Sequence, residues 1–493
     1  MCAQDNTAAK IIPRRPERLD ISSKAAFDQL RNWISVCNKS HQACRRNSEL
    51  YMPSNVIQII DSMSEEPKLR IRRTPPREEY IALSYCWGEG QSIKAAKCTI
   101  DDLTRSINYR DLPRTIQDAI TVTSELGCRF LWVDVLCIIQ DDEIHIAKEI
   151  ALMPRIYEGA YATIVAARSR SCDQGFLNDI ITPSPLSHVF RFPLRGHNSA
   201  SGSILCFGQE KNHNIKDPIE CRAWPLQEFL LSHRVIRFGV HQVTWLCPCT
   251  WETQRKNEAP NWWLRQEQAI VNIKTKFHQR LGDLSAWDQL VWDYTSRKLS
   301  KPGDKLLAIS GIASKLAEKS EDIYIAGMWY RHLPRGLLWE VGSLLEPRPS
   351  QYRAPSWSWA SVNGRISFAV GASSEDDPDL QILSIDSELI EPTAPCGNLK
   401  SASITVRGWI RRLYWTDLST TLLELDESES VQHDARDTLA DTMADASEDK
   451  NHDMLLVWCL QICTNTMNDG PHGLILTKEY GNVFKRRGHF YLL

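Results

Sequence analysis

The sequence has no long hydrophobic run. No uninterrupted apolar stretch of the 493 residues approaches membrane-spanning length, and residues 1–20 lack the hydrophobic core of a signal peptide. The chain also lacks a marked charge of either sign: its formal net charge is −3, and no basic tract interleaved with aromatic residues is present. We therefore expect a cytoplasmic protein with no membrane span and no nucleic-acid partner.

Common catalytic motifs are absent as well. The sequence contains no GxSxG nucleophile elbow, no HExxH zinc motif and no Walker loop. Gly88 and Gly90 lack the third glycine of a dinucleotide-binding turn, which favours a plain loop. Cys137 and His145 could suggest a thiol nucleophile, but Cys137 lies inside an apolar strand pattern. No internal repeat is visible, which excludes a solenoid or propeller recognition array.

The cysteines give no disulfide framework. There are fifteen, an odd number, and they are scattered along the chain. Several of them, such as Cys86 and Cys137, lie inside apolar strand patterns. This distribution favours a reduced cytosolic protein.

One cysteine spacing invites a zinc interpretation. Cys37, His41 and Cys44 share one face of a helix predicted over residues 25–44. A structural zinc site normally needs four ligands, however, and no CxxC partner lies nearby. Separately, the segment Cys247-Pro248-Cys249 is too closely spaced and too isolated to indicate a metal site. We therefore expect a packed Cys/His helix face and no metal site.

What the sequence does contain is a dense alternation of strand and helix patterns between residues 80 and 167. Apolar runs predict buried strands at Tyr80–Gly88, Phe130–Ile139 and Tyr161–Ala167. Helical stripes lie between them, at residues 113–127 and 146–159. This order is typical of a parallel α/β sheet with right-handed crossovers. Pro154 should kink the second helix or end it early.

The middle strand pattern carries one charge, Asp134, and ends in the polar segment Gln140–Asp142. A carboxylate inside an apolar run is costly unless it is paired or lies at the strand's exit. In open α/β sheets, ligands bind at the carboxyl edge of the strands. The sequence therefore predicts a ligand site near Asp134.

The rest of the chain predicts further regions. Tryptophan is abundant, with seventeen residues, mostly after Trp224, which indicates large flat side chains filling a broad core. Alternation predicts strands at 354–360 and 404–410, whereas the acidic segment 425–450 predicts a disordered insertion. The expected regions are an N-terminal helix with short strands (1–75), an α/β domain (76–260), a helical extension (261–345) and a β-rich C-terminal region (346–493).

The α/β region carries a family resemblance. The blocks YIALSYCWG, LPRTIQDAI, LGCRFLWVDVLCIIQDD, IYEGA and CRAWPLQEFLLSHRVIRF follow one another between residues 80 and 238. In this order they resemble the fungal heterokaryon-incompatibility (HET) domain. The resemblance implies a role in programmed cell death and nonself recognition after fusion of genetically unlike cells. It also implies a TIR-like, flavodoxin-like sheet.

The same resemblance points to a candidate catalytic residue. Some TIR domains cleave NAD with one essential glutamate in a Trp-x3-Glu helix motif, and Trp224 and Glu228 reproduce that spacing. These residues lie one turn apart on one helix face. Cleaving the bond between ribose and nicotinamide builds positive charge on the sugar, which a carboxylate stabilises. The alternative is that Glu228 pairs with Arg222 or Arg234 and only holds the helix.

Other residues would complete such a site. Asp134 is a second catalytic candidate, for ribose hydroxyls or positioning; its alternative is a buried carboxylate that caps a neighbouring segment. Ser84, Tyr85 and Trp87 follow the first strand and, with Trp224, would bind substrate, although they could equally belong to the core.

Two functions remain open from the sequence. In the first, the domain is a non-enzymatic TIR-like interaction module that binds protein partners or itself in a cell-death pathway. In the second, it is an NAD glycohydrolase that kills by depleting NAD. Neither function needs a bound cofactor, since NAD would be a substrate.

Overall fold

The computed structural model describes most of the chain. The described residues are 20–44, 51–61, 66–89, 91–178, 189–195, 201–207, 216–240, 242–253, 264–279, 283–342, 347–368, 374–416, 422–424, 454–465 and 471–491. They form two compact units, Met1–Arg280 and Leu281–Leu493. The predicted insertion at 425–450 lies outside the described residues.

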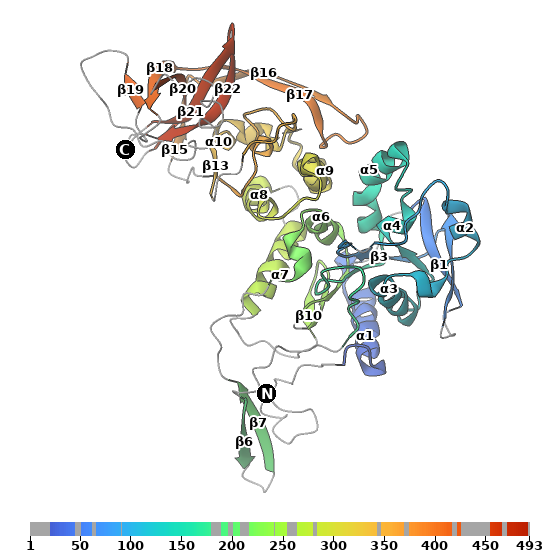
Figure 1. Cartoon of the computed structure of the whole chain (residues 1–493). Coiled ribbons are helices and arrows are strands. Elements are labelled where there is room, and N and C mark those ends of the chain that lie inside the picture. Colours follow the sequence, from blue (N-terminus) through green and yellow to red (C-terminus); the bar gives the residue numbers. More distant parts are fainter. Residues whose placement is uncertain are drawn as a thin grey trace. The chain divides into compact units, whose positions relative to one another are not determined.

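The first unit is built on an eight-stranded sheet with the order β10-β9-β8-β5-β3-β4-β1-β2. Strands β1, β3 and β10 of this sheet are labelled in Figure 1. Its four central strands are parallel: β3 (Tyr80–Ser84), β4 (Phe130–Trp132), β5 (Ala162–Val165) and β8 (Val235–Phe238). Two antiparallel strands extend each edge: β1 (Asn55–Asp61), β2 (Lys68–Arg73), β9 (Val243–Leu246) and β10 (Trp251–Thr253). Every residue of β3, β4, β5 and β8 is buried, and the apolar runs predict this for the first three strands.

The order of the parallel strands defines where a ligand would bind. Taken by chain position, β4-β3-β5-β8 is the order 2-1-3-4, which is that of flavodoxin-type sheets. The chain leaves β3 in one direction, towards β4, and leaves β5 in the other, towards β8. The switch point therefore lies between the carboxyl ends of β3 and β5, beside Ser84 and Val165.

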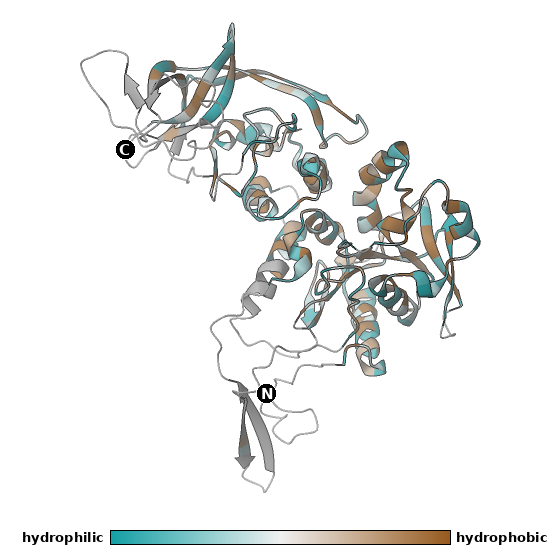
Figure 2. Ribbon diagram, in the orientation of Figure 1, coloured by the Kyte–Doolittle hydropathy of each residue, from teal (hydrophilic) through white to brown (hydrophobic). Residues whose placement is uncertain are grey.

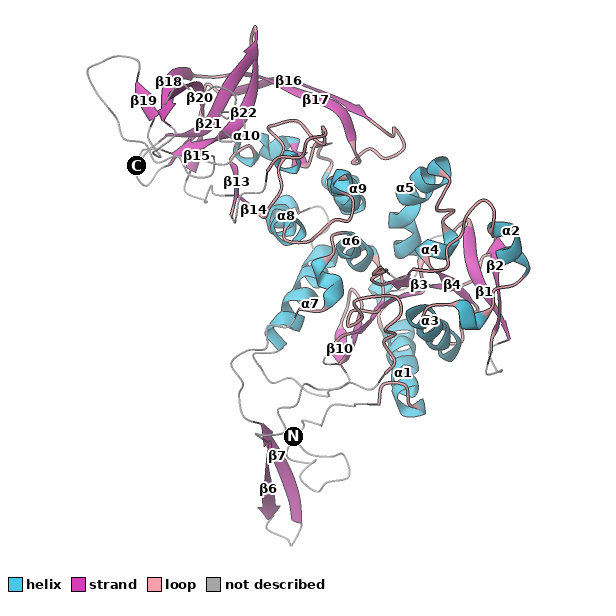
Figure 3. Cartoon of the chain, in the orientation of Figure 1, coloured by secondary structure: helices cyan, strands magenta, loops and turns pink. Residues whose placement is uncertain are grey.

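Helices cover both faces of this sheet. Figure 3 shows α3 (Arg114–Glu125) on one side of the strands and α5 (Glu143–Gly159) on the other. Hydrophobic residues run along α5 and the strands beside it (Figure 2), and Met153, Ile156 and Tyr157 are buried there. The remaining helices of this unit are α1 (Lys24–Ser40), α2 (Ile100–Arg105), α4 (Asp134–Cys137), α6 (Trp224–Leu231) and α7 (Leu264–Gln279), and a β6–β7 hairpin joins Val189–Arg195 to Ser201–Phe207.

The predicted strand Phe130–Ile139 is wrong in its second half. β4 ends at Trp132, and Asp134–Cys137 forms the single helical turn α4. The carboxylate of Asp134 accepts a hydrogen bond from its neighbour Val135 N at 2.7 Å, which starts the turn. Periodicity could not separate the two structures, because the residues after Asp134 are fully buried in either one.

Pro154 does not end its helix. α5 continues from Glu143 to Gly159 with Pro154 inside it. Proline removes one backbone hydrogen bond. Burial of Met153, Ile156 and Tyr157 on both sides of Pro154 offsets that loss, because this face packs on the sheet.

The second unit begins with a tryptophan-rich helical core. It contains α8 (Trp287–Thr295), α9 (Leu307–Ser320), α10 (Leu333–Gly336) and the short strands β11 (Tyr324–Ile325), β12 (Met328–Trp329), β13 (Trp339–Val341) and β14 (Ile366–Phe368). The indole N–H groups of Trp287 and Trp359 both donate to the carbonyl of Gly327, at 3.0 and 2.7 Å. Trp287 also meets Trp329 edge to face, with ring centroids 5.5 Å apart. Tryptophans therefore do fill the core here.

The C-terminal region is β-rich, as predicted. A six-stranded sheet contains β15 (Ser374–Asp376), β18 (Ile410–Thr416), β19 (Leu422–Glu424), β20 (Met454–Asn465), β21 (Pro471–Tyr480) and β22 (Val483–Tyr491), and a separate hairpin pairs β16 (Gln381–Leu389) with β17 (Leu399–Arg407). The strand predicted at 354–360 is instead a turn followed by a 3-10 helix at Trp359–Ser361. Ser358 causes this: its hydroxyl accepts from Ala360 N at 3.0 Å and donates to Ala326 O at 2.6 Å.

Helices that could cross a membrane were sought throughout the described ranges. None of them is both long enough and apolar enough to do so.

Candidate functional site

The site is centred on a serine–glutamate pair at the switch point of the sheet. Ser84 is the last residue of β3, and Glu228 lies in α6, which packs against β3 and α5. The Ser84 hydroxyl donates a hydrogen bond to Oε2 of Glu228. Both side chains are buried, with exposed fractions of 1% and 6%. Residues separated by 144 positions are thus joined where this type of sheet binds ligands.

Burial makes Glu228 a weaker acid than an exposed glutamate. The pKa of Glu228 is raised from 4.5 to about 7, chiefly by loss of water on burial and in smaller part by the nearby Asp134 carboxylate. The Ser84 hydrogen bond, the charge of Arg222 and the Tyr157 hydroxyl act in the opposite direction and lower this pKa. Near neutral pH, Glu228 therefore exists in both its acid and its ionised form.

Asp134 provides a second carboxyl group beside the first. It begins α4, immediately beyond the carboxyl end of β4, and its side chain is half-buried. The indole Nε1–H of Trp87 donates to both carboxylate oxygens, at 3.2 and 3.0 Å. Loss of water raises the pKa of Asp134 to about 6, against the lowering by the Val135 N–H and the indole.

Arg222 and two tyrosines complete the surroundings. Arg222 precedes α6 and donates to the carbonyl of Tyr85 at 2.8 Å, and its charge lowers the pKa of both carboxyl groups. The hydroxyl of Tyr85 donates to Gln91 Oε1 at 3.3 Å. Tyr157 reaches the same edge from α5 and donates to the carbonyl of Leu83 at 3.2 Å.

The structure brings together five of the six residues that the sequence singled out. Ser84 donates a hydrogen bond to Glu228, and Trp87 donates one to Asp134. Burial raises the pKa of Tyr85, and the charge of the nearby Asp134 raises it further. The sixth, Trp224, lies half-buried in the first turn of α6, one turn before Glu228. Their chemical roles remain predictions.

The alternative role for Glu228, an ion pair with Arg222 or Arg234, is only partly met. Arg222 acts on Glu228 through its charge, while Arg234 donates to Asn38 Oδ1 at 2.6 Å and to the carbonyl of Cys44 at 3.2 Å. Tyr157 was not predicted to belong to the site, because its helical spacing indicates a core residue. Only the strand order places it beside Glu228.

Four other side chains, which could bind a metal ion, lie close together in the first unit. Cys37, His41 and Cys44 lie together, although the predicted helix ends at Ser40 and Cys44 belongs to a short 3-10 helix. Cys247 joins them from the turn after β9. A fourth side chain that could bind a metal ion, which the sequence did not indicate, therefore lies beside the other three. The spacing of Cys37, His41 and Cys44 along the chain could not reveal Cys247, because its position depends on the pairing of β9 with β8 in the folded sheet.

Comparison with known families identifies the α/β region. Residues 80–228 match the family model described as "Heterokaryon incompatibility protein (HET)". The match begins with β3 and ends at Glu228. The chain is therefore a HET domain-containing protein, with a function related to heterokaryon incompatibility. No curated protein and no solved structure matches the chain.

Proposed function

We propose that this HET domain is an effector in fungal nonself recognition that hydrolyses the glycosidic bond of NAD and so triggers cell death. The observation that supports this most is the buried Ser84–Glu228 pair at the switch point, with the Asp134 carboxyl group beside it. Two acidic groups in different environments at a ligand edge are typical of glycoside chemistry.

Glu228 would act in its ionised form. As the bond from ribose C1′ to the nicotinamide nitrogen breaks, its electron pair neutralises the pyridinium charge, and positive charge develops on the ribose. The carboxylate of Glu228 stabilises that charge. Water then adds to C1′ and loses a proton to solvent, so that NAD⁺ and water give ADP-ribose, nicotinamide and H⁺.

The neighbouring residues would hold the nucleotide. Asp134, with a pKa of about 6, is mostly ionised at pH 7 and would accept hydrogen bonds from the ribose hydroxyls. Arg222 supplies positive charge at the same edge, which suits a diphosphate. The indoles of Trp87 and Trp224 offer flat surfaces for an aromatic base. Ser84 and Tyr85 position the acidic groups.

Product analysis tests this proposal. The purified full-length chain is incubated with NAD, and nicotinamide and ADP-ribose are separated and quantified. Equal amounts of the two products, formed in proportion to enzyme, support the proposal. Wild-type protein that forms neither product, even when concentrated or clustered on a scaffold, overturns it.

A TIR-like interaction module is the second candidate, and one observation favours it. Ile144, in the first turn of α5, is 83% exposed, although isoleucine is usually buried. In this case the domain would work by binding protein partners or itself. Ile144→Glu should then abolish killing and self-association, whereas Glu228→Gln should leave both unchanged. The reverse result favours the enzyme.

A further inference from the structure

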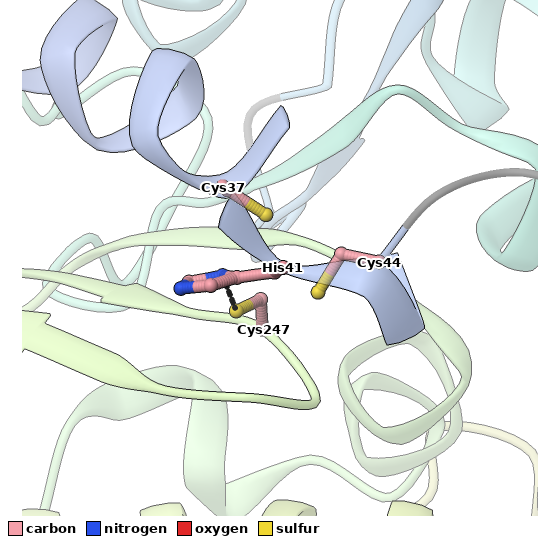
Figure 4. Close-up of side chains that lie close together, drawn as sticks. All are labelled: Cys37, His41, Cys44 and Cys247. Carbon is pink, nitrogen blue, oxygen red and sulfur yellow. Dashed lines mark hydrogen bonds between the residues drawn. The ribbon is translucent and has the colours of Figure 1, made fainter. Parts of the chain in front are cut away.

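We propose that Cys37, His41, Cys44 and Cys247 bind one structural zinc ion, which joins the N-terminal helix to the turn after β9 in the sheet of the first unit. Cys37 lies in the last turn of α1, His41 caps that helix, and Cys44 ends the 3-10 helix Gln42–Cys44. Cys247 directly follows β9. Figure 4 shows the three sulfur atoms and the imidazole gathered around a common point.

The distances suit tetrahedral zinc. The four ligand atoms all lie within 4.8 Å of one another, and the Cys247 sulfur is 3.4 Å from Nδ1 of His41. Bond lengths of about 2.3 Å for Zn–S and about 2.0 Å for Zn–N place sulfur and nitrogen roughly 3.5 Å apart in a tetrahedron. Small side-chain shifts would therefore close the set around one ion.

The choice of metal follows from the ligands. Three thiolates and one imidazole are soft or borderline donors, which select zinc over magnesium or calcium. Cys37 and Cys44 have no exposed surface, and Cys247 has 4%. Four protein ligands leave no open position for a substrate, so the site is structural rather than catalytic.

The surroundings support a charged centre. A zinc ion with three thiolates and one imidazole carries a net charge of −1. The guanidinium of Arg234 is buried next to the set and donates to the carbonyl of Cys44 at 3.2 Å. His41 N donates to the carbonyl of Cys37 at 3.2 Å, and Cys44 N donates to that of His41 at 3.0 Å. These bonds fix the segment that carries three of the ligands.

The position of the site in the chain gives its function. All four ligands lie outside the family match at 80–228, and His41 is 206 residues from Cys247. The ion therefore closes a loop that contains the whole matched domain. A clip on so long a loop restricts the unfolded chain strongly. Because the unfolded chain has no preformed site, the free energy of zinc binding also stabilises the folded protein.

Metal content is the first test. Full-length protein purified without added chelator should contain about one zinc per chain by elemental analysis. After chelation, Co²⁺ should restore the site with thiolate charge-transfer and tetrahedral absorption bands. Protein that has no zinc and gives no such cobalt spectrum overturns the proposal. So does a disulfide between these cysteines, detected as a 2 Da mass loss under non-reducing conditions.

Matched variants identify the fourth ligand. Cys247→Ser should abolish zinc retention and lower Tm by about 5 °C or more. Cys249→Ser is the control, because its sulfur lies in the same turn, 3.7 Å from that of Cys44, yet outside the set of four. It should retain zinc. If Cys249→Ser loses zinc while Cys247→Ser keeps it, the assignment is wrong.

A third variant covers failure of Cys247→Ser to fold. His41→Cys supplies a fourth thiolate and should keep one zinc per chain, with a cobalt spectrum shifted towards that of four sulfur ligands. An unchanged spectrum would show that His41 is not a ligand. The variants and the cobalt titration of the wild-type protein are independent measurements. At least one of them therefore gives a result that supports or overturns the zinc site.

Discussion

Glu228 is buried at the carboxyl ends of the strands, where its carboxyl group accepts a hydrogen bond from the Ser84 hydroxyl. Such an environment favours the neutral acid, and its pKa of about 7 expresses that preference. A group poised between two protonation states near neutral pH suits catalysis better than structure. Burying the ionised carboxylate also lowers the stability of the folded protein, and the size of this loss depends on pH.

The stability cost of Glu228 can be measured through Glu228→Gln. The folded-state pKa of about 7 lies above the ordinary 4.5, so the folded protein holds the proton more tightly. Stability of the wild type should therefore fall as pH rises from about 4.5 through 7. Relative to wild type, Glu228→Gln should gain about 1–3 kcal/mol in free energy of unfolding between pH 5 and pH 8. A difference that stays constant across this range contradicts the raised pKa.

Ser84→Ala tests the hydrogen bond separately from the carboxylate. The Ser84 hydroxyl lowers the pKa of Glu228, so its removal should raise that pKa further. If ionised Glu228 is the active form, the rise of nicotinamide release with pH should move to higher pH in this variant. Activity at high pH should recover towards the wild-type value. An equal loss at every pH would show that Ser84 acts in another way.

At the scale of elements, the helix and strand patterns predicted the parallel core well. The β3, β5 and α3 segments follow directly from buried apolar runs and a helical stripe. The pattern failed at Asp134–Cys137, because full burial removes the contrast between helix and strand. It failed again at 354–360, where one serine side chain competes for backbone groups.

Gly327 tests the tryptophan core of the second unit. Its φ of +93° lies where other residues are strained, and a Cβ would lie 2.6 Å from Nε1 of Trp359. Gly327→Ala should therefore lower the free energy of unfolding by about 1–3 kcal/mol, measured by chemical denaturation. Gly303→Ala is the control, because a Cβ there meets nothing within 4 Å. Equal stability of the two variants would show that the close packing is not limiting.

At the scale of the molecule, the chain around the HET match completes the fold. β1 and β2 precede the matched residues and β8, β9 and β10 follow them, yet all five belong to its sheet. The sequence placed the first two in a separate N-terminal region. Order within a sheet depends on contacts between distant residues, which local patterns do not contain.

The candidate site, too, could be predicted only in the part that lies in recognisable local patterns. Local spacing and family resemblance found Glu228, Asp134 and Ser84, because each lies at or near the end of a recognisable element. The contributions of Tyr157 and Cys247 could not be found in this way. Tyr157 lies on a helix face that is otherwise core. Cys247 lies in the turn after β9, a strand that pairs with β8 and β10 only in the folded sheet.

The most direct test of the catalytic claim compares two buried glutamates. Glu149 is 1% exposed and accepts a hydrogen bond from the Ser54 hydroxyl at 2.6 Å. It is therefore, like Glu228, a buried glutamate bonded to a serine, but it is not one of the residues assigned to the site around Ser84, Glu228 and Asp134. Initial rates of nicotinamide release are measured for Glu228→Gln, Glu149→Gln and wild type, with folding checked by circular dichroism. We predict a loss of ~10² or more for Glu228→Gln and a change of no more than about threefold for Glu149→Gln. A folded Glu228→Gln protein that releases nicotinamide as fast as wild type would contradict the account.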